Sequence, residues 1–374
     1  MVATLRVMLD QVVAPTDPIL GEASRELAAA LVRRAPEGCV VEAIAPAGGS
    51  GELEDVSGLV GVQRTALARR ELAAALQLGV GTGIGGGMIH SPTLFAPLVR
   101  HSRTHDNDQT VVTLWDLGPW ESPDEYSRNT VAWHKAMLKR AVKHADAVVV
   151  PTHAIADRLA SIAKLGKRIR VISGAAPQNY RVPSDEIGRR RVLSLPEGFL
   201  LMSGGPGESA ALDIGFGGIA ASGIDLPVVV LDVADGAEPA IADLASAAGV
   251  PEHRLHVRGS LDVADRAAVF GGALAFVAPS RRTAFPWRVV EALALGVPLV
   301  AVESPVLSEV VADGGIIISG ADAPTLRDGL GEALSTALES TASADRLAVM
   351  AADRGRSFSW NEAAERVWQL HAEL

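Results

Sequence analysis

The chain has 374 residues, of which 48% are hydrophobic and 21% are charged, a composition typical of folded globular proteins and not of disordered ones. This length predicts two domains of ordinary size. The formal net charge is −10, and the 29 arginines and 5 lysines form no long basic run, so we expect no nucleic-acid partner. Cys39 is the only cysteine, which excludes an internal disulfide and a cysteine-based metal site.

The first residues run directly into a strand pattern and lack the basic and apolar regions of a secretion signal. No window approaches the ~18 apolar residues that a membrane span needs. We therefore expect a cytoplasmic protein with at most peripheral membrane contact. The nine histidines are scattered, and His90, His134 and His153, which lie at positions defined by the strand and helix pattern, form no pair with a carboxylate at metal-binding spacing, so no metal is expected.

Short Val/Ile/Leu runs alternate with longer Ala/Leu/Arg/Glu segments, a pattern typical of βαβ units on a parallel sheet. In the first half the predicted strands are 5–9, 40–45, 88–90, 111–114, 147–150 and 170–172, with helices over 22–34, 71–78 and 131–144. The proline-containing segment 175–196 is predicted to be a linker. The predicted strands of the second half are 199–202, 228–231, 255–257, 275–277, 299–302 and 316–318. The repeated pattern predicts an α/β fold with two Rossmann-like parallel-sheet domains facing an interdomain cleft.

The glycine-rich segment 79–87 contains a Gly-x-Gly-x-x-Gly match. A dinucleotide-binding fingerprint needs a strand before it and a helix after it, whereas here a helix precedes and a strand follows. We interpret the segment as a flexible loop beside the cleft and not as a cofactor motif.

The most informative segment spans residues 277–298, where a buried strand, a loop and a helix follow one another. The strand ends at Pro279 and Ser280, and the helix carries Glu291. Loop amides and a helix N-terminus can hold a phosphate, and a carboxylate one or two turns along can reach a ribose diol. An ordinary βα unit without a ligand is the alternative.

These residues resemble family-4 retaining glycosyltransferases of the GT-B fold, whose hallmark reads Pro-Ser-x-x-Glu-Gly-Phe-Gly-Leu-Pro-x-x-Glu-Ala. Further similar stretches are 112–117, 145–154, 258–262, the surroundings of Glu309, and 357–360. The resemblance covers nearly the whole chain. It implies an acceptor-side domain over 1–178, a nucleotide-sugar domain over 179–355 and a C-terminal helix over 356–374 that crosses back to the first domain.

The chain departs from the family pattern at several catalytic positions. Trp115 replaces the family's histidine in the catalytic cleft, Thr283 replaces the first glutamate of the hallmark, and the stretch around Ala210 lacks the Arg-Lys pair that grips the pyrophosphate. Pro286 has no N–H to donate. Only the second glutamate, Glu291, matches, and the resemblance assigns it to the ribose.

The resemblance implies a hexosyltransferase that uses a nucleotide sugar, retains anomeric configuration and needs neither metal nor cofactor, with GDP- and UDP-sugars both open. The acceptor would be a glycan or lipid-linked intermediate of cell-envelope polysaccharide synthesis. The residues expected at the catalytic site are Trp115, Asp116 and Thr283, and those expected to bind the donor are Gly204, Gly205, Ser280, Arg281, Arg282, Ala284, Phe285, Arg288 and Glu291. The three arginines are expected to screen the phosphate, with solvated surface arginines as the alternative. The rival hypothesis is an inactive glycosyltransferase-like subunit that supports an active paralogue, and another GT-B activity such as an epimerase or phosphorylase is also open.

Overall fold

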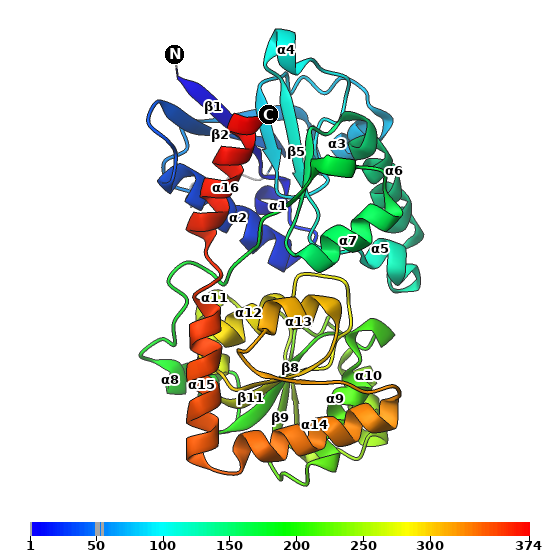
Figure 1. The fold of residues 1–374 in the computed structure, drawn as a ribbon, viewed down its shortest axis with the longest axis vertical. Helices are drawn as coiled ribbons and strands as arrows, with labels where there is room; N and C mark the ends of the chain where they lie inside the picture. The colour runs from blue at the N-terminus through cyan, green and yellow to red at the C-terminus, as the bar shows by residue number, and fades with distance from the viewer. Residues whose placement is uncertain (1, 49–52, 54–55) are drawn as a thin grey trace. The chain divides into compact units, whose positions relative to one another are not determined.

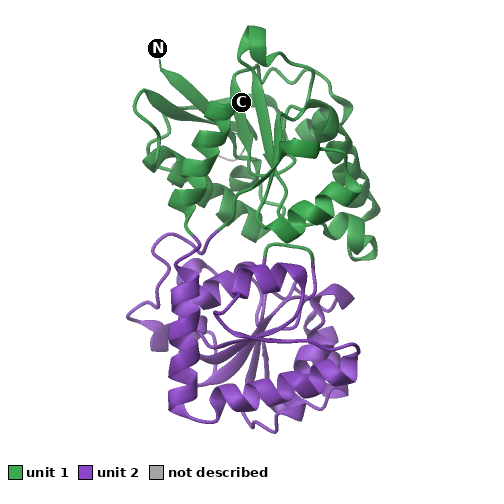
Figure 2. Cartoon of the chain, in the orientation of Figure 1, with its two compact units in different colours: residues 1–174, 283–285, 359–374 green, residues 175–282, 286–358 purple. Residues whose placement is uncertain are grey.

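The computed structural model describes residues 2–48, 53 and 56–374. They form two compact units, coloured separately in Figure 2. Unit 1 is Met1–Gly174 with Thr283–Phe285 and Ser359–Leu374, and unit 2 is Ala175–Arg282 with Pro286–Phe358. The sequence predicted domain boundaries after residues 178 and 355, and in the structure the corresponding boundaries of the two units lie after Gly174 and Phe358.

Unit 1 is built on a parallel sheet in the strand order β3-β2-β1-β4-β5-β6-β7. All six strands predicted in this half are present. The strands are β1 (Ala3–Met8), β2 (Cys39–Ala47), β3 (Gly61–Ala68), β4 (Met88–Ser91), β5 (Gln109–Thr113), β6 (Ala147–Val150) and β7 (Ile169–Val171).

The helices of unit 1 are α1 (Asp10–Val13), α2 (Pro18–Arg33), α3 (Arg69–Leu78), α4 (Arg103–Asp106), α5 (Gly118–Glu121), α6 (Arg128–His144), α7 (His153–Ile162) and α16 (Trp360–Glu373), with 3-10 turns η1 (Pro123–Glu125) and η2 (Gly166–Arg168). The C-terminal helix α16 lies against α2 (Figure 1). Its Trp368 indole donates to the Leu31 carbonyl at 3.1 Å. The last residues of the chain are thereby part of the unit that begins it.

Unit 2 repeats this plan on a parallel sheet in the order β10-β9-β8-β11-β12-β13. Its strands are β8 (Phe199–Ser203), β9 (Val228–Leu231), β10 (Leu255–Val257), β11 (Ala273–Ala278), β12 (Leu299–Val302) and β13 (Ile316–Ile318). Its helices are α8 (Glu186–Val192), α9 (Leu212–Ala221), α10 (Glu238–Ala247), α11 (Val263–Gly272), α12 (Trp287–Ala294), α13 (Pro305–Val311), α14 (Ala323–Leu338) and α15 (Thr341–Gly355), with 3-10 turns η3 (Glu208–Ala210) and η4 (Glu252–Arg254). The predicted α/β fold with two parallel sheets is therefore confirmed.

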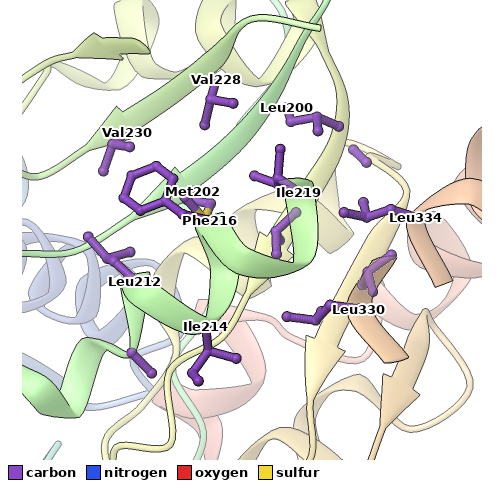
Figure 3. Packing of buried hydrophobic residues seen from close by; sticks show 14 of the residues in the cluster. Leu200, Met202, Leu212, Ile214, Phe216, Ile219, Val228, Val230, Leu330 and Leu334 are labelled. Atoms are coloured by element: carbon purple, nitrogen blue, oxygen red, sulfur yellow. The ribbon is translucent and has the colours of Figure 1, made fainter. Parts of the chain in front are cut away.

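The core of unit 2 lies between its sheet and helices α9 and α14. Figure 3 shows Leu200, Met202 and Phe216 among the side chains packed there, all of them buried. A Cβ placed on Gly218 of α9 would lie 2.4 Å from the Leu330 Cβ. The small side chains of α9 therefore let α14 approach closely.

Two elements differ from the sequence expectations. Strand β3 was not predicted, because at this edge of the sheet its residues are mostly half-buried or exposed and present no apolar run. The segment predicted as a linker contains helix α8, so that prediction was wrong in part. Arg190 of α8 is buried and donates to the Ala268 carbonyl at 3.0 Å, which fastens the helix to α11.

Within the described residues, no helix is both long enough and apolar enough to cross a lipid bilayer.

Candidate functional site

The strand order of unit 2 identifies where its sheet can bind a ligand. The first strand in sequence, β8, lies between β9 and β11, so the chain winds outward in one direction through β9 and β10 and in the other through β11, β12 and β13. In open parallel sheets, ligands bind at the carboxyl ends of the strands where this direction reverses. The loops that follow β8 and β11 flank this point.

The loop after β8 begins with Gly204 and Gly205. Gly204 adopts a φ of +131°, a conformation that favours glycine, and its N–H donates to the Leu231 carbonyl at 2.9 Å. A Cβ on Gly205 would meet no atom within 4 Å, so this residue borders open space. Helix α9 starts shortly afterwards without a side-chain cap. The loop thus exposes backbone at the carboxyl edge of the sheet.

The loop after β11 is tied to the loop after β8. The Ser280 hydroxyl donates to the Ser209 carbonyl at 3.1 Å, and the Arg282 guanidinium donates to the Ser209 hydroxyl. Arg281 and Arg282 are exposed. The structure therefore brings together five residues predicted to bind the donor: Gly204, Gly205, Ser280, Arg281 and Arg282.

Arg288 and Glu291, also predicted to bind the donor, lie in a buried charge network on α12. Arg288 donates to both carboxylate oxygens of Asp232, at 2.8 and 2.9 Å, and to Glu291 Oε1 at 2.8 Å. Arg266 of α11 donates from Nε to both oxygens of Glu291, at 3.0 Å each. The side chains of Arg266, Arg288 and Glu291 are 2%, 6% and 3% exposed. Two guanidinium groups and two carboxylates therefore neutralise one another away from water.

Tyr180 also contacts this network. Its hydroxyl donates to Glu291 Oε2 across a long 3.5 Å contact, and the Arg266 guanidinium lies 6.0 Å from the centre of its ring. Burial, together with the Glu291 carboxylate, raises the pKa of Tyr180. The phenol therefore stays protonated and can act as a hydrogen-bond donor to Glu291.

The hallmark residues Thr283–Phe285 belong to unit 1. Ala284 forms an antiparallel bridge with Asp116. The Leu117 amide donates to the Thr283 carbonyl at 2.9 Å, and the Phe285 amide donates to the Trp115 carbonyl at 2.8 Å. The loop after β11 thus joins residues expected on the donor side with those expected on the catalytic side, and its Phe285 amide already has an acceptor.

Trp115 fills space within unit 1. Its side chain is buried, and its indole N–H donates to the Pro92 carbonyl at 2.8 Å. Its ring centre lies 5.9 Å from that of Phe285 and 6.2 Å from that of Trp360. Asp116 accepts from the Gly118 amide at 2.9 Å. At this position the tryptophan thus supplies packing and one satisfied hydrogen bond.

Sequence reasoning missed an ion pair at the corresponding point of unit 1. The strand order reverses around β1, and Asp10 lies directly after that strand, 1% exposed. Arg69, at the start of α3, donates to Asp10 Oδ2 at 3.0 Å. Burial raises the pKa of Asp10 to about 6, although Arg69 opposes the shift. Its position just after the first predicted strand was the available signal.

The glycine-rich segment lies at one edge of the sheet of unit 1. It leads into the amino end of β4 at Met88, so it lies at the edge of the sheet opposite the carboxyl ends. Arg6 donates to the Ile84 carbonyl at 2.6 Å within it. The segment thus lies away from the carboxyl ends of the strands, because strand direction and not glycine content decides the edge at which a loop lies, and its position beside a cleft stays a prediction. Among the described residues, no group of three or more His, Cys, Asp or Glu side chains could hold a metal ion.

Comparison with known proteins adds a family match and a shared fold. Residues 220–336 match the family described as glycosyl transferases group 1. The chain is similar in structure to sucrose-phosphate synthase from Thermosynechococcus elongatus, with a TM-score of 0.69 and 19% identity over 99% of this chain and 98% of that one. It is also similar to HepE from Anabaena in complex with UDP and glucose, with a TM-score of 0.71 and 15% identity over 100% of both chains.

A third solved structure, WaaG, a glycosyltransferase involved in lipopolysaccharide biosynthesis, has a TM-score of 0.66 and 14% identity over 97% of this chain and 98% of that one. Identities this low establish the common fold. No curated protein sequence matches the chain significantly. The chain therefore has the GT-B fold of these solved structures, and its residues 220–336 match the family described as glycosyl transferases group 1.

Proposed function

We propose that this protein transfers a hexose from a nucleotide sugar to a glycan or lipid-linked acceptor, with retention of configuration and without a metal. The observation that carries the proposal is the pair of tied loops at the switch point of unit 2. Gly205 borders open space on one loop, and the other loop carries Ser280 and the exposed Arg281. Neighbours of the same fold that were solved with UDP or UDP-glucose support a nucleotide sugar as the donor.

In this proposal the exposed Arg281 and Arg282 contact the diphosphate. Arg288 is less suited to that role, because its guanidinium is buried against Asp232 and Glu291. Charge-assisted hydrogen bonds from arginine to phosphate are strong and directional. They would stabilise the negative charge that grows on the departing nucleoside diphosphate, while a donor phosphate oxygen accepts the acceptor's proton.

The ribose role of Glu291 stays a prediction with a specific requirement. Oε1 accepts from Arg288 and Arg266, whereas Oε2 accepts from Arg266 and from Tyr180 at 3.5 Å. A ribose hydroxyl that binds Glu291 would therefore compete with Tyr180 for Oε2.

The acceptor is proposed to bind at the switch point of unit 1, where Asp10 and Arg69 lie. The solved structure of WaaG, described as involved in lipopolysaccharide biosynthesis, favours an acceptor of cell-envelope polysaccharide synthesis. We expect the reaction to take place in the cytoplasm, where nucleotide sugars are available.

Donor binding is tested by calorimetric titration of UDP, GDP, TDP and their sugars into the wild type and Gly205→Val. A Cβ at residue 205 would meet no protein atom within 4 Å, so the substitution should leave folding intact and block the close approach of a diphosphate. We expect one nucleotide class to bind the wild type and its affinity to fall at least about tenfold in Gly205→Val, the equivalent of about 1.4 kcal/mol. The matched control is Gly188→Val on α8, where an added Cβ would also meet no atom within 4 Å outside the backbone of its own helix.

Turnover is measured by following donor consumption and the product anomer by NMR, with and without EDTA. Retention with unchanged rates in EDTA is the expected result, and inversion or loss of activity in EDTA would contradict it. Binding of no nucleotide by the wild type, or equal binding by Gly205→Val, would overturn the donor site itself.

The second candidate is a non-catalytic subunit that supports an active paralogue. The observation that favours it is the closed network of Arg266, Arg288, Asp232 and Glu291, which occupies the carboxylate assigned to the ribose. Nucleotide binding without turnover, or no binding at all, would select this candidate over the enzyme.

A further inference from the structure

Unit 1 contains a strongly basic cavity at the edge of its sheet opposite the carboxyl ends of the strands. The cavity has a volume of about 490 Å³ and is lined by Arg100, His101, Arg103, Lys143, His144, Ala145, Asp146, Lys167, Arg168, Arg170, Glu373 and Leu374. Residues 145–146 and 167–168 immediately precede β6 and β7, so the cavity lies at the amino ends of these strands. All of its lining residues belong to unit 1. It is therefore separate from the loops proposed to bind the donor.

The lining carries six arginine and lysine side chains against two side-chain carboxylates, in a chain whose formal net charge is −10, and the Leu374 main-chain oxygen accepts from Arg103 at 3.1 Å. Several of these cations already have partners. Arg103 pairs with Asp146 at 3.3 Å, and Arg168 donates to the Ala145 and Val142 carbonyls at 2.8 and 2.7 Å. Arg170 donates to the Ile169 carbonyl at 3.2 Å. Part of the positive charge thus serves the fold.

Three cations remain without a carboxylate partner among the described residues, namely Arg100, Lys143 and Lys167, and all three are exposed. Lys143 lies in the last turn of α6, where its charge complements the helix dipole, but this requires only one cation. Arg100 and Lys167 come from two other segments. Convergence of three such groups on one cavity leaves an uncompensated positive field.

The half-buried Asp146 is already paired with His101 and Arg103 and therefore does not compensate for the other three cations. Asp146 accepts from His101 at 2.7 Å and from the Thr110 amide at 2.8 Å. Burial alone would raise the pKa of Asp146, but these hydrogen bonds lower it overall, and the bond to Asp146 raises the pKa of His101. His101 therefore gains positive character in the same place.

We propose that this cavity binds an anion with at least two negative charges, of the diphosphate or phosphomonoester class. Ammonium and guanidinium groups are the usual partners of phosphate oxygens. The same chemistry would recognise a soluble phosphorylated ligand or the phosphate of a lipid headgroup. The proposal does not depend on the proposed donor site or on turnover.

The test is calorimetric titration of sodium pyrophosphate and co-sedimentation with vesicles of phosphatidic acid, whose headgroup is a phosphomonoester, and phosphatidylcholine in equal parts. The variant is Lys143→Gln with Lys167→Gln, and the matched control is Lys135→Gln with Lys164→Gln, two exposed lysines outside the cavity. We expect the cavity variant to lose at least about tenfold in affinity for the probe that binds, roughly the value of one charge-assisted hydrogen bond. The control variant should bind like the wild type, and added salt should weaken binding.

A titration of pyrophosphate into Gly205→Val distinguishes binding at the cavity from binding at the donor loops. The variant should still bind pyrophosphate at the cavity. If the cavity variant loses affinity for pyrophosphate alone, the ligand is a soluble phosphorylated compound. If it also loses binding to the vesicles, the ligand is a lipid headgroup. Equal binding by the cavity variant and the wild type, or no binding of either probe by the wild type, would overturn the proposal. Matching circular dichroism and melting curves for all variants exclude misfolding as the cause of a loss.

Discussion

The two clusters of basic side chains in this protein differ in what surrounds them. In unit 2, Arg266 and Arg288 are almost fully buried, and each guanidinium donates to a carboxylate. In unit 1, Lys143 and Lys167 are exposed at a cavity and have no carboxylate partner among the described residues. The contrast shows that the presence of a cation near a motif does not make it available to a ligand. Its partners within the fold decide that.

The physical cause of this difference is desolvation. A guanidinium removed from water must be paired, because an isolated buried charge costs several kcal/mol. An exposed ammonium keeps its hydration and has no such requirement. The buried cluster should therefore contribute strongly to the stability of the fold and should not bind added phosphate. The exposed cluster should contribute little to stability and should bind phosphate.

The largest expected effect comes from opening the buried network. Arg266→Met leaves Glu291 with one guanidinium instead of two, and we expect the free energy of unfolding of unit 2 to fall by about 3–5 kcal/mol. The measurement is urea unfolding followed by tryptophan fluorescence and circular dichroism. Arg346→Met, which changes an exposed arginine of α15, is the matched control and should change stability by less than about 0.5 kcal/mol.

The double variant Arg266→Met with Glu291→Leu tests the cause of that loss. If the cost comes from a buried carboxylate that lacks its partner, removing the carboxylate should restore part of the stability. Additive losses in the double variant would show that packing, and not charge pairing, holds α11 against α12.

An effect of intermediate size on stability is expected from two buried histidines of unit 1, which are held in their uncharged form. His371 lies in contact with Gln109 at 2.8 Å and with His90 at 3.4 Å, and burial lowers the pKa of His371 to about 4. Burial, and then His371, also lowers the pKa of His90. Because the unfolded chain binds these protons more readily, stability should fall as the pH drops from about 6.5 towards 4.

For His371 this loss amounts to about 2 kcal/mol between pH 7 and pH 5. Asp10 acts in the opposite direction, because its pKa is raised from 3.8 to about 6 and the folded protein takes up that proton first. We expect His371→Gln to remove about 2 kcal/mol of the acid-induced loss, measured by urea unfolding at the two pH values. The exposed His105→Gln should leave the pH dependence unchanged, and an unchanged dependence in His371→Gln would contradict the assignment.

Most of the fold could be predicted because the buried strands carry continuous apolar runs. The strands Ala147–Val150 and Val228–Leu231 have the bounds that the sequence predicted. Strand β3 was missed because Gln63 and Arg64 interrupt its pattern at the edge of the sheet, where one face needs no apolar cover. The apolar pattern of the sequence thus indicates which residues are buried, and it predicts a strand only where that strand is buried.

The candidate site was predictable only to the extent that it follows from local pattern. The strand–loop–helix around Ser280 and Glu291 could be found from the chain order alone. The partners of Glu291 could not, since Arg266 lies 25 residues away and Tyr180 lies 111 residues away along the chain. The basic cavity was invisible for the same reason, because Arg100, Lys143 and Lys167 come together only through the topology of the sheet.

The smallest expected effect is the one that most sharply separates the two clusters. Lys143→Gln removes a cation that no carboxylate compensates, so we expect the free energy of unfolding to change by less than about 0.5 kcal/mol, against several for Arg266→Met. Relief of repulsion from neighbouring cations can even raise it slightly. Urea unfolding at low and high salt measures the difference, and Lys135→Gln on the same helix serves as the control. A loss of about 2 kcal/mol would mean that Lys143 supports the fold as Arg266 does, and a cation with such a structural role would no longer be available to bind a phosphorylated ligand.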